Sequence, residues 1–215
     1  MWHAWLAIVG LGVFHGLNPA MGWLFAVSNG MQAGRAGGVW RALPPLAAGH
    51  LLAIGVVLLP LSLLSLYMLN LRPLAIAVGV LLIGLGLYKL LVPRHPRILA
   101  RIGPRHLVLW SFLMATSHGA GLMVAPFLLD LEHAHAAGDE SLGHLGHLPH
   151  LMPPGLGSAA LVTLVHTGFM ILTAGALAWV VYRYLGLRLL RQSWFNIDVV
   201  WAVFLILVGV IALLP

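Results

Sequence analysis

Four histidines lie in long apolar stretches of the sequence, where ionisable side chains are otherwise absent. His15, His50, His118 and His166 each fall near the middle of a stretch without Asp, Glu, Lys or Arg. Polar groups at such depth normally face the interior of a helix bundle, and neutral imidazole is the commonest metal ligand among side chains. The four could therefore converge on one metal site. The alternative is that each is only hydrogen-bonded to a neighbouring helix.

The residues after the first of these histidines predict a distortion of the helix. Asn18 follows His15 by about one turn and shares its face. Pro19 has no backbone donor, which frees a carbonyl oxygen about one turn earlier. Residues 15–22 are therefore predicted to form a locally opened helix, in which Asn18 and backbone carbonyls add to the metal ligands.

Candidates for a proton or cation relay lie on two later segments. Thr163 and Met170 share a face with His166 at helical spacing, although packing is the simpler role for the methionine. Asp198 lies near the start of the last apolar stretch, where it could relay protons or cations. Its alternative role is an ion pair with Arg188 or Arg191.

A second group of histidines lies in one polar segment, residues 130–156, which also carries acidic side chains. Its members are His133, His135, His144, His147 and His150. Histidine-rich tracts bind borderline transition metals, so we expect weak metal scavenging or sensing here, with a solvated loop as the alternative. The chain has no cysteine, which excludes thiolate ligands, disulfides and iron–sulfur clusters.

The composition that surrounds these residues is that of an integral membrane protein. Of 215 residues, 61% are hydrophobic and only 7% are charged, whereas a soluble domain has about 25% charged residues. Disorder is excluded because it requires low hydrophobicity and high charge. The net charge of +6 does not indicate nucleic-acid binding, because the basic residues lie in short connectors between apolar runs. The expected partner is the lipid bilayer.

Stretches free of charge predict six transmembrane helices in one membrane domain, residues 1–215. A spanning helix needs about 20 apolar residues, and the apolar runs do not alternate in polarity as barrel strands do. The fold class is therefore all-α. The predicted helices cover residues 3–28, 43–66, 72–92, 106–130, 157–182 and 195–214.

The distribution of basic residues predicts the orientation. Of the 11 Lys and Arg residues, all except Arg72 fall in the connectors after the first, third and fifth predicted helices. Because cytoplasmic connectors are enriched in positive charge, this side is predicted to be cytoplasmic. Both termini and the histidine-rich loop are then outside a bacterial cell membrane. The N-terminus lacks the basic region of a signal peptide, so it is assigned to the first helix.

A weak internal repeat divides the chain into residues 1–92 and 106–215. His15-Gly16 in the first predicted helix matches His118-Gly119 in the fourth, and the next helix of each unit carries His50 or His166. Three helices are an odd number, so the second unit would be inserted upside down. Inverted repeats are common in secondary transporters, whose binding sites lie near the membrane midplane where the repeats meet.

The run His15-Gly16-Leu17-Asn18-Pro19, followed by Gly49-His50, resembles the nickel/cobalt transporter superfamily, which includes urease and hydrogenase accessory permeases and efflux proteins. The resemblance implies a permease in which His15 and His50 handle a divalent transition metal of the nickel, cobalt or zinc class. The family motif usually has a second histidine, or an Asp–His pair, shortly after the first. Met21 occupies that region here, which favours a softer ion.

The leading interpretation is transport of a divalent transition-metal ion through a midplane histidine site between two inverted repeats. Two alternatives stay open. The same histidines could serve a membrane enzyme that depends on a metal or on haem, or could relay protons in an exporter of a small solute. The sequence leaves open the ion, the direction of transport and whether the protein is a homo-oligomer.

Overall fold

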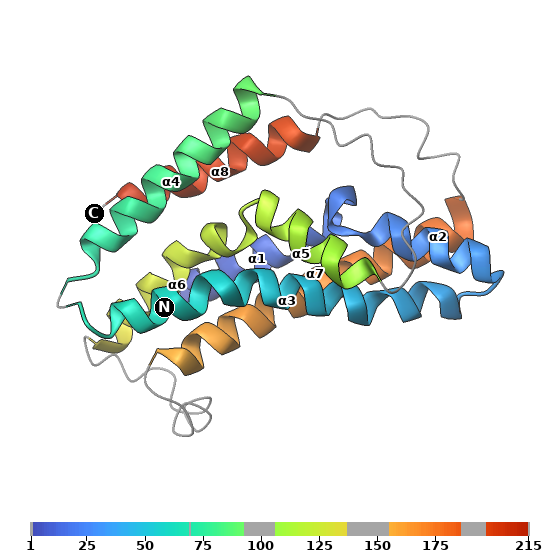
Figure 1. Ribbon diagram of the computed structural model, residues 1–215, viewed down its shortest axis with the longest axis horizontal. Coiled ribbons are helices and arrows are strands. Elements are labelled where there is room, and N and C mark those ends of the chain that lie inside the picture. The colour runs from blue at the N-terminus through green and yellow to red at the C-terminus, as the bar shows by residue number, and fades with distance from the viewer. Residues whose placement is uncertain (1, 69, 93–105, 137–154, 186–196, 215) are drawn as a thin grey trace.

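The computed structural model describes residues 2–68, 70–92, 106–136, 155–185 and 197–214, and within these ranges every regular element is helical (Figure 1). The all-α prediction is confirmed. The elements are α1 (Trp2–Leu17), the 3-10 turn η1 (Pro19–Met21), α2 (Trp23–Ala33), α3 (Gly37–Ser65), α4 (Arg72–Leu91), α5 (Leu107–Ser117), α6 (Ala120–Ala136), α7 (Leu156–Val180), the π-helical turn η4 (Val181–Leu185) and α8 (Ile197–Leu213).

Three helical stretches are long and apolar enough to cross a membrane individually. They are α3, α4 and the continuous stretch Leu156–Tyr184, which joins α7 to η4. A fourth span is formed if α5 and α6, bent by 64° at their junction, are taken together. Helices α1 and α8 are shorter, with 16 and 17 residues. The described part of the chain thus has three to four candidate spans, which indicates membrane integration.

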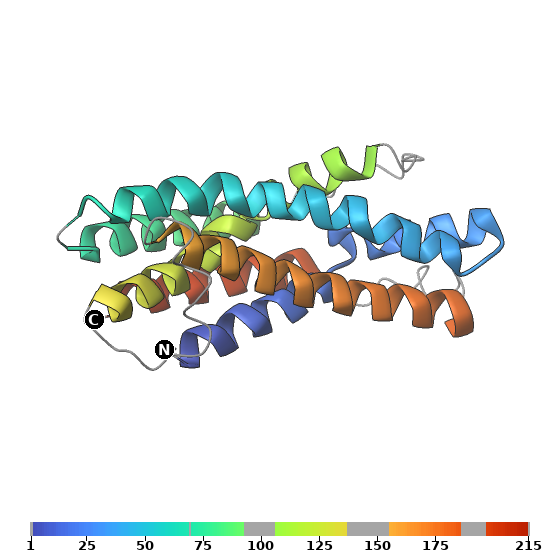
Figure 2. The same cartoon turned by 90° about the horizontal axis from the view of Figure 1, so that it is seen from below.

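The helices form a main bundle and a separate pair. Helix α3 runs along the longest axis with α7 beside it, and α1 lies along α7, while α4 and α8 lie together at an angle to the others (Figures 1 and 2). One buried apolar cluster includes Leu82 from α4 and Leu205 from α8 together with residues of α6, such as Leu128. This cluster attaches the α4–α8 pair to the rest of the molecule.

The prediction of one continuous helix over residues 3–28 is wrong. Helix α1 ends at Leu17, and α2 begins only at Trp23. The break follows from local chemistry: Pro19 starts the 3-10 turn, and Gly22 has φ 109°, a left-handed conformation that favours glycine. The predicted local opening of residues 15–22 is present, and it extends to a complete interruption of the helix.

The predicted helix over residues 106–130 is also interrupted. Helix α5 ends at Ser117 and α6 begins at Ala120, with His118 as the cap and Gly119 at φ 70°. The other four predicted helices are present, although α3 begins earlier than residue 43, at Gly37.

Glycines allow the closest contacts between helices. A Cβ atom on Gly79 of α4 would lie 2.9 Å from the carbonyl oxygen of Gly209 on α8, and a Cβ on Gly209 would lie 2.8 Å from that of Gly79. Small residues at such positions let helix backbones approach one another in membranes. The Arg72 guanidinium also donates hydrogen bonds to the carbonyls of Leu213 and Leu214. The start of α4 is thereby tied to the end of α8.

Candidate metal centre

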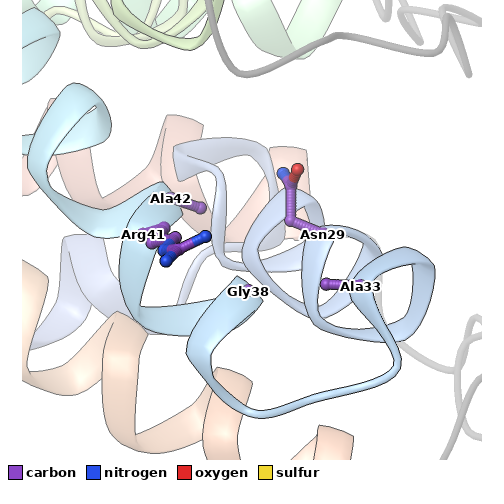
Figure 3. Close-up of a pocket in the computed structure, with 5 residues that line it drawn as sticks. All are labelled: Asn29, Ala33, Gly38, Arg41 and Ala42. Atoms are coloured by element: carbon purple, nitrogen blue, oxygen red, sulfur yellow. The ribbon is translucent and has the colours of Figure 1, made fainter.

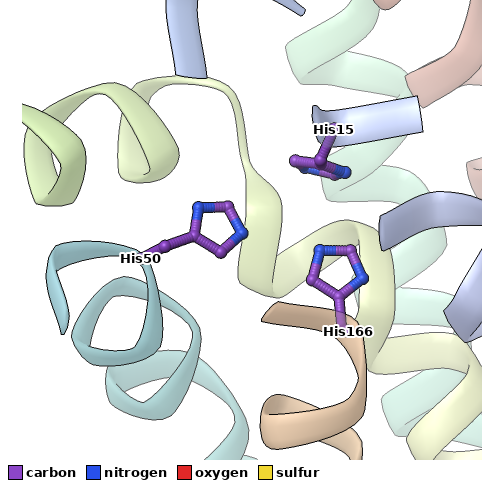
Figure 4. Close-up of side chains that lie close together, drawn as sticks. All are labelled: His15, His50 and His166. Atoms are coloured by element: carbon purple, nitrogen blue, oxygen red, sulfur yellow. The ribbon is translucent and has the colours of Figure 1, made fainter. Parts of the chain in front are cut away.

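Three of the four apolar-segment histidines meet in the interior of the bundle. His15 from α1, His50 from α3 and His166 from α7 are fully buried, and their rings face one another (Figure 4). Ring centroids are 5.5 Å apart for His15 and His50, 4.8 Å for His15 and His166, and 5.6 Å for His50 and His166. Each ring offers a nitrogen atom, and these three atoms lie within 4.8 Å of one another. We call these residues the histidine triad.

Hydrogen bonds to the backbone orient two of the triad rings and leave one nitrogen lone pair of each available to a metal. The Nδ1 of His15 donates to the carbonyl of Leu11 at 2.9 Å, and the Nδ1 of His166 donates to the carbonyl of Ile8 at 3.2 Å. A carbonyl can only accept, so Nδ1 carries the proton and Nε2 keeps its lone pair. Metal-bound histidines usually anchor their second nitrogen in this way.

The remaining ring nitrogens of the triad have no protein partner among the described residues. They are buried and comprise the Nε2 atoms of His15 and His166 and both ring nitrogens of His50. Buried polar atoms are normally hydrogen-bonded, and an exception calls for an explanation such as an ion or a water molecule. The unpartnered nitrogens therefore point to a ligand held by the triad.

Close helix packing explains why residues distant in sequence meet here. A Cβ atom on Gly12 would lie 2.6 Å from the carbonyl oxygen of His166, and one on Gly16 would lie 2.5 Å from that of Met170. Similarly, a Cβ atom on Gly49, which precedes His50, would lie 2.7 Å from the Cβ atom of Ser111 on α5. Small residues thus flank two of the three triad histidines. They allow α1 to approach α7 closely and α3 to approach α5 closely.

The donor set suits a borderline transition metal. Neutral imidazole binds zinc, nickel, cobalt and copper, whereas magnesium and calcium prefer oxygen ligands. Three nitrogens around a tetrahedral zinc ion, each at about 2.0–2.1 Å, lie about 3.4 Å from one another. The triad nitrogens, within 4.8 Å of one another, need only small ring movements to reach that spacing.

His118 is not one of the three histidines whose ring nitrogens lie within 4.8 Å of one another, so its predicted role as a ligand stays a prediction. Its Nδ1 donates to the carbonyl of Met114 at 2.8 Å, and its ring packs against Trp201, with centroids 5.4 Å apart. Trp201 also contacts His15 at a centroid distance of 4.4 Å. The fourth histidine therefore lies near the triad through a shared tryptophan contact.

Asn18 has a structural role in the described part of the chain, while its predicted ligand role stays a prediction. Its Oδ1 accepts a hydrogen bond from the backbone N–H of Ala20 at 3.0 Å and caps the η1 turn. Its buried Nδ2 has no partner among the described residues, but an amide nitrogen is a donor and does not ligate metal. Asn18 therefore shapes the break after α1.

The predicted relay residues serve packing where the structure describes them. Thr163 donates to the carbonyl of Ala159 on its own helix at 2.7 Å, and Met170 is fully buried in an apolar cluster. Asp198 lies in the first turn of α8, and its side chain is outside the described residues.

The histidine-rich segment begins as helix. Residues 130–136 belong to α6, which corrects the prediction of a loop starting at residue 130. His133 is exposed on this helix. His135 also lies in α6, but its side chain is not described, and His144, His147 and His150 lie outside the described residues.

Two polar contacts near the bundle interior were not anticipated from sequence. Trp201 is fully buried and donates from Nε1 to the carbonyl of His118 at 2.9 Å. Glu132 accepts hydrogen bonds from Ser62, at 2.7 Å, and from Ser65, and so joins α6 to the end of α3. No sequence signal marked Trp201, because it is one of eight tryptophans in an apolar chain.

A separate cavity of about 190 Å³ lies between α2 and α3 (Figure 3). Its lining residues are Asn29, Ala33, Gly38, Arg41 and Ala42. The set includes no imidazole, carboxylate or thioether, so it lacks the ligands that a transition metal prefers. The cavity is therefore distinct from the metal centre.

No family model, no curated protein and no solved structure matches the chain.

Proposed function

We propose that the protein transports a divalent transition-metal ion across a membrane and that the histidine triad binds the ion in transit. The observation that carries the proposal is the convergence of three fully buried imidazoles from three helices, with unpartnered nitrogens within 4.8 Å. All three are neutral nitrogen donors, which favours an ion of the zinc, nickel or cobalt class. The resemblance of the His15 and His50 segments to nickel/cobalt transporters supports the same substrate class.

We further propose six membrane segments arranged as two inverted three-helix repeats. In each proposed repeat the first segment is interrupted close to a histidine: α1 ends at Leu17, two residues after His15, and α5 ends at Ser117, one residue before His118. Helix α1 packs along α7, and α5 packs along α3. If the two proposed repeats are exchanged, the α1–α7 pair takes the place of the α5–α3 pair. The reciprocal contact between Gly79 and Gly209 in the α4–α8 pair also fits a two-fold relation.

Hydrogen bonding of the His-Gly histidines follows the same pattern. His15 and His118 each donate from Nδ1 to the carbonyl four residues earlier, Leu11 at 2.9 Å and Met114 at 2.8 Å. In this arrangement His15 and His50 come from the first repeat and His166 from the second. The ion site then lies where the repeats meet, as in many secondary transporters.

The proposed mechanism uses the triad to replace hydration water around the ion. The backbone bonds of His15 and His166 hold their Nε2 atoms toward the site, so little ordering is needed when the ion arrives. The interruptions after α1 and α5 are places where backbone dihedrals can change, as hinges require. Rocking of one repeat against the other would then expose the triad to each side in turn.

A metal-dependent membrane enzyme is the second candidate. Three histidines with an open fourth position are also the ligand set of some catalytic zinc sites. Such an enzyme needs a general base, and among the described residues the triad group includes no carboxylate. Haem binding would give a Soret band in the absorption spectrum of the purified protein, and proton-coupled export of a solute would proceed without added metal.

The test is metal flux into proteoliposomes that contain the purified full-length chain. We expect the wild type to carry Zn²⁺, Ni²⁺ or Co²⁺ to an enclosed indicator, and His50→Ala to reduce the rate to that of empty vesicles. The matched control is His106→Ala, because His106 is exposed at the start of α5. Equal flux through wild type and His50→Ala would overturn the proposal.

In the cell we propose that the protein resides in a bacterial inner membrane with both termini outside, as the basic connectors suggest.

A further inference from the structure

One aromatic side chain contacts both the triad and the interrupted segment of the second repeat. Trp201, on α8, is fully buried and meets the His15 ring almost edge-on, with centroids 4.4 Å apart and ring planes at 87°. It meets the His118 ring similarly, at 5.4 Å and 82°. Both imidazoles therefore share one indole neighbour.

The indole is held in place from two directions. Its Nε1 donates to the carbonyl of His118 at 2.9 Å. Phe14 stacks on it, with centroids 5.1 Å apart and planes at 6°, and Phe14 in turn stacks on Phe204 at 4.5 Å. Phe14 is the residue immediately before His15, so α1 contributes both the stacking ring and the triad ligand.

The carbonyl that accepts this bond belongs to the interruption of the α5–α6 segment. His118 caps α5, Gly119 has φ 70°, and the two helices diverge by 64°. The indole N–H of α8 donates to this carbonyl and thereby links α8 to the break.

We infer that Trp201 is the positioning residue that couples ion occupancy of the triad to movement at the α5–α6 break. This inference rests on the proposed transport function. Ion binding requires the triad nitrogens to draw together, and His15 cannot reorient without displacing the indole packed against it. That displacement is transmitted to the break through the bond to the His118 carbonyl. Trp201 thus acts on transport without ligating the ion.

The test compares Trp201→Phe with Trp110→Phe in two assays. Phenylalanine keeps an aromatic ring at position 201 but removes the N–H that reaches His118. Trp110 is the control, because its indole packs against Phe25 and its buried Nε1 has no partner among the described residues. The assays are equilibrium Zn²⁺ binding by the purified full-length protein and Zn²⁺ flux in proteoliposomes.

We expect Trp201→Phe to bind Zn²⁺ within about threefold of the wild type but to transport it about fivefold to tenfold more slowly, as loss of one buried hydrogen bond implies. Trp110→Phe should match the wild type in both assays. Equal flux through the two variants would overturn the inference while leaving transport itself intact. Loss of Zn²⁺ binding by Trp201→Phe would also overturn it, because the indole would then shape the site. A wild type that binds Zn²⁺ without moving it would refute the proposed function, and the inference with it.

Discussion

At the scale of single residues, the bonding of the second ring nitrogen distinguishes the histidines. In His15 and His166 one nitrogen is anchored on a carbonyl of α1, and the other is buried with no partner in the described part of the chain. In His50 neither ring nitrogen has a partner in those described segments. An apolar interior gives these nitrogens no compensation unless an ion or water binds them. This is the physical reason to interpret the triad as a binding site.

The sequence alone identified the residue type that forms this group, histidine, but not which histidines lie together. Depth within apolar stretches selected His15, His50 and His166, which the structure brings together, because polar groups there must face the bundle interior. It also selected His118, which the structure does not place in the group of three. Asn18 was assigned to the metal because a sequence shows shared faces but not which backbone N–H an amide oxygen will cap.

Asn18 provides a prediction at this scale. Because its Oδ1 caps η1, we expect Asn18→Ala to destabilise the protein by about 1 kcal/mol, whereas Asn18→Ser, which restores a capping oxygen, stays close to the wild type. Thermal unfolding of the purified protein measures the first effect. Both variants should bind Zn²⁺ with wild-type affinity, and a selective loss of affinity in Asn18→Ala would instead identify Asn18 as a ligand.

At the scale of elements, interrupted helices and close-packed glycines position the site. Hydropathy predicted where apolar segments lie, and the all-α fold follows from it. It could not predict that two segments break, because Pro19 and Gly119 are compatible with either a kink or an interruption. Nor could it show that Gly12 faces the backbone of α7, since local periodicity does not reveal contacts between distant segments.

Helix α1 offers a matched pair of glycines for a test of this packing. A methyl group at Gly12 would meet the backbone oxygen of His166 at 2.6 Å, whereas nothing lies within 4 Å of a methyl group at Gly10. Overpacking typically costs about 1–3 kcal/mol, so we expect Gly12→Ala to separate α1 from α7 and weaken Zn²⁺ binding at least tenfold. Gly10→Ala should bind normally. Similar affinities for both variants would show that α1–α7 spacing does not set the triad geometry.

At the scale of the whole molecule, the helices differ in whether each is long enough to cross a membrane alone. Three stretches qualify alone and a fourth through the bent α5–α6 pair, while α1 and α8 are short. The six-span arrangement requires α1 with α2, and also α8, to cross as well. The positions of the charged connectors predict these additional crossings.

The absence of cysteine makes this topology directly testable with single-cysteine variants. We expect Trp2→Cys, Tyr67→Cys and Leu214→Cys to react with an impermeant maleimide from outside intact cells, and Arg35→Cys to react only after permeabilisation. All four positions are exposed: Trp2 is the first residue of α1, Arg35 lies between α2 and α3, and Tyr67 and Leu214 follow α3 and α8. If Trp2 and Arg35 react from the same side, the α1–α2 segment does not cross and the six-span arrangement fails.

The central claim, that the histidine triad binds one divalent transition-metal ion, is tested most directly by Zn²⁺ titration calorimetry of the purified protein. The background should carry glutamine in place of the polar-segment histidines, namely His133, His135, His144, His147 and His150, so that they add no sites. We predict one Zn²⁺ per chain, retention of this binding in His118→Ala, and a loss in His50→Ala that exceeds the roughly 10- to 100-fold effect of removing an outer hydrogen-bond partner. Undiminished binding by His50→Ala, or no binding in the background protein, would contradict the account.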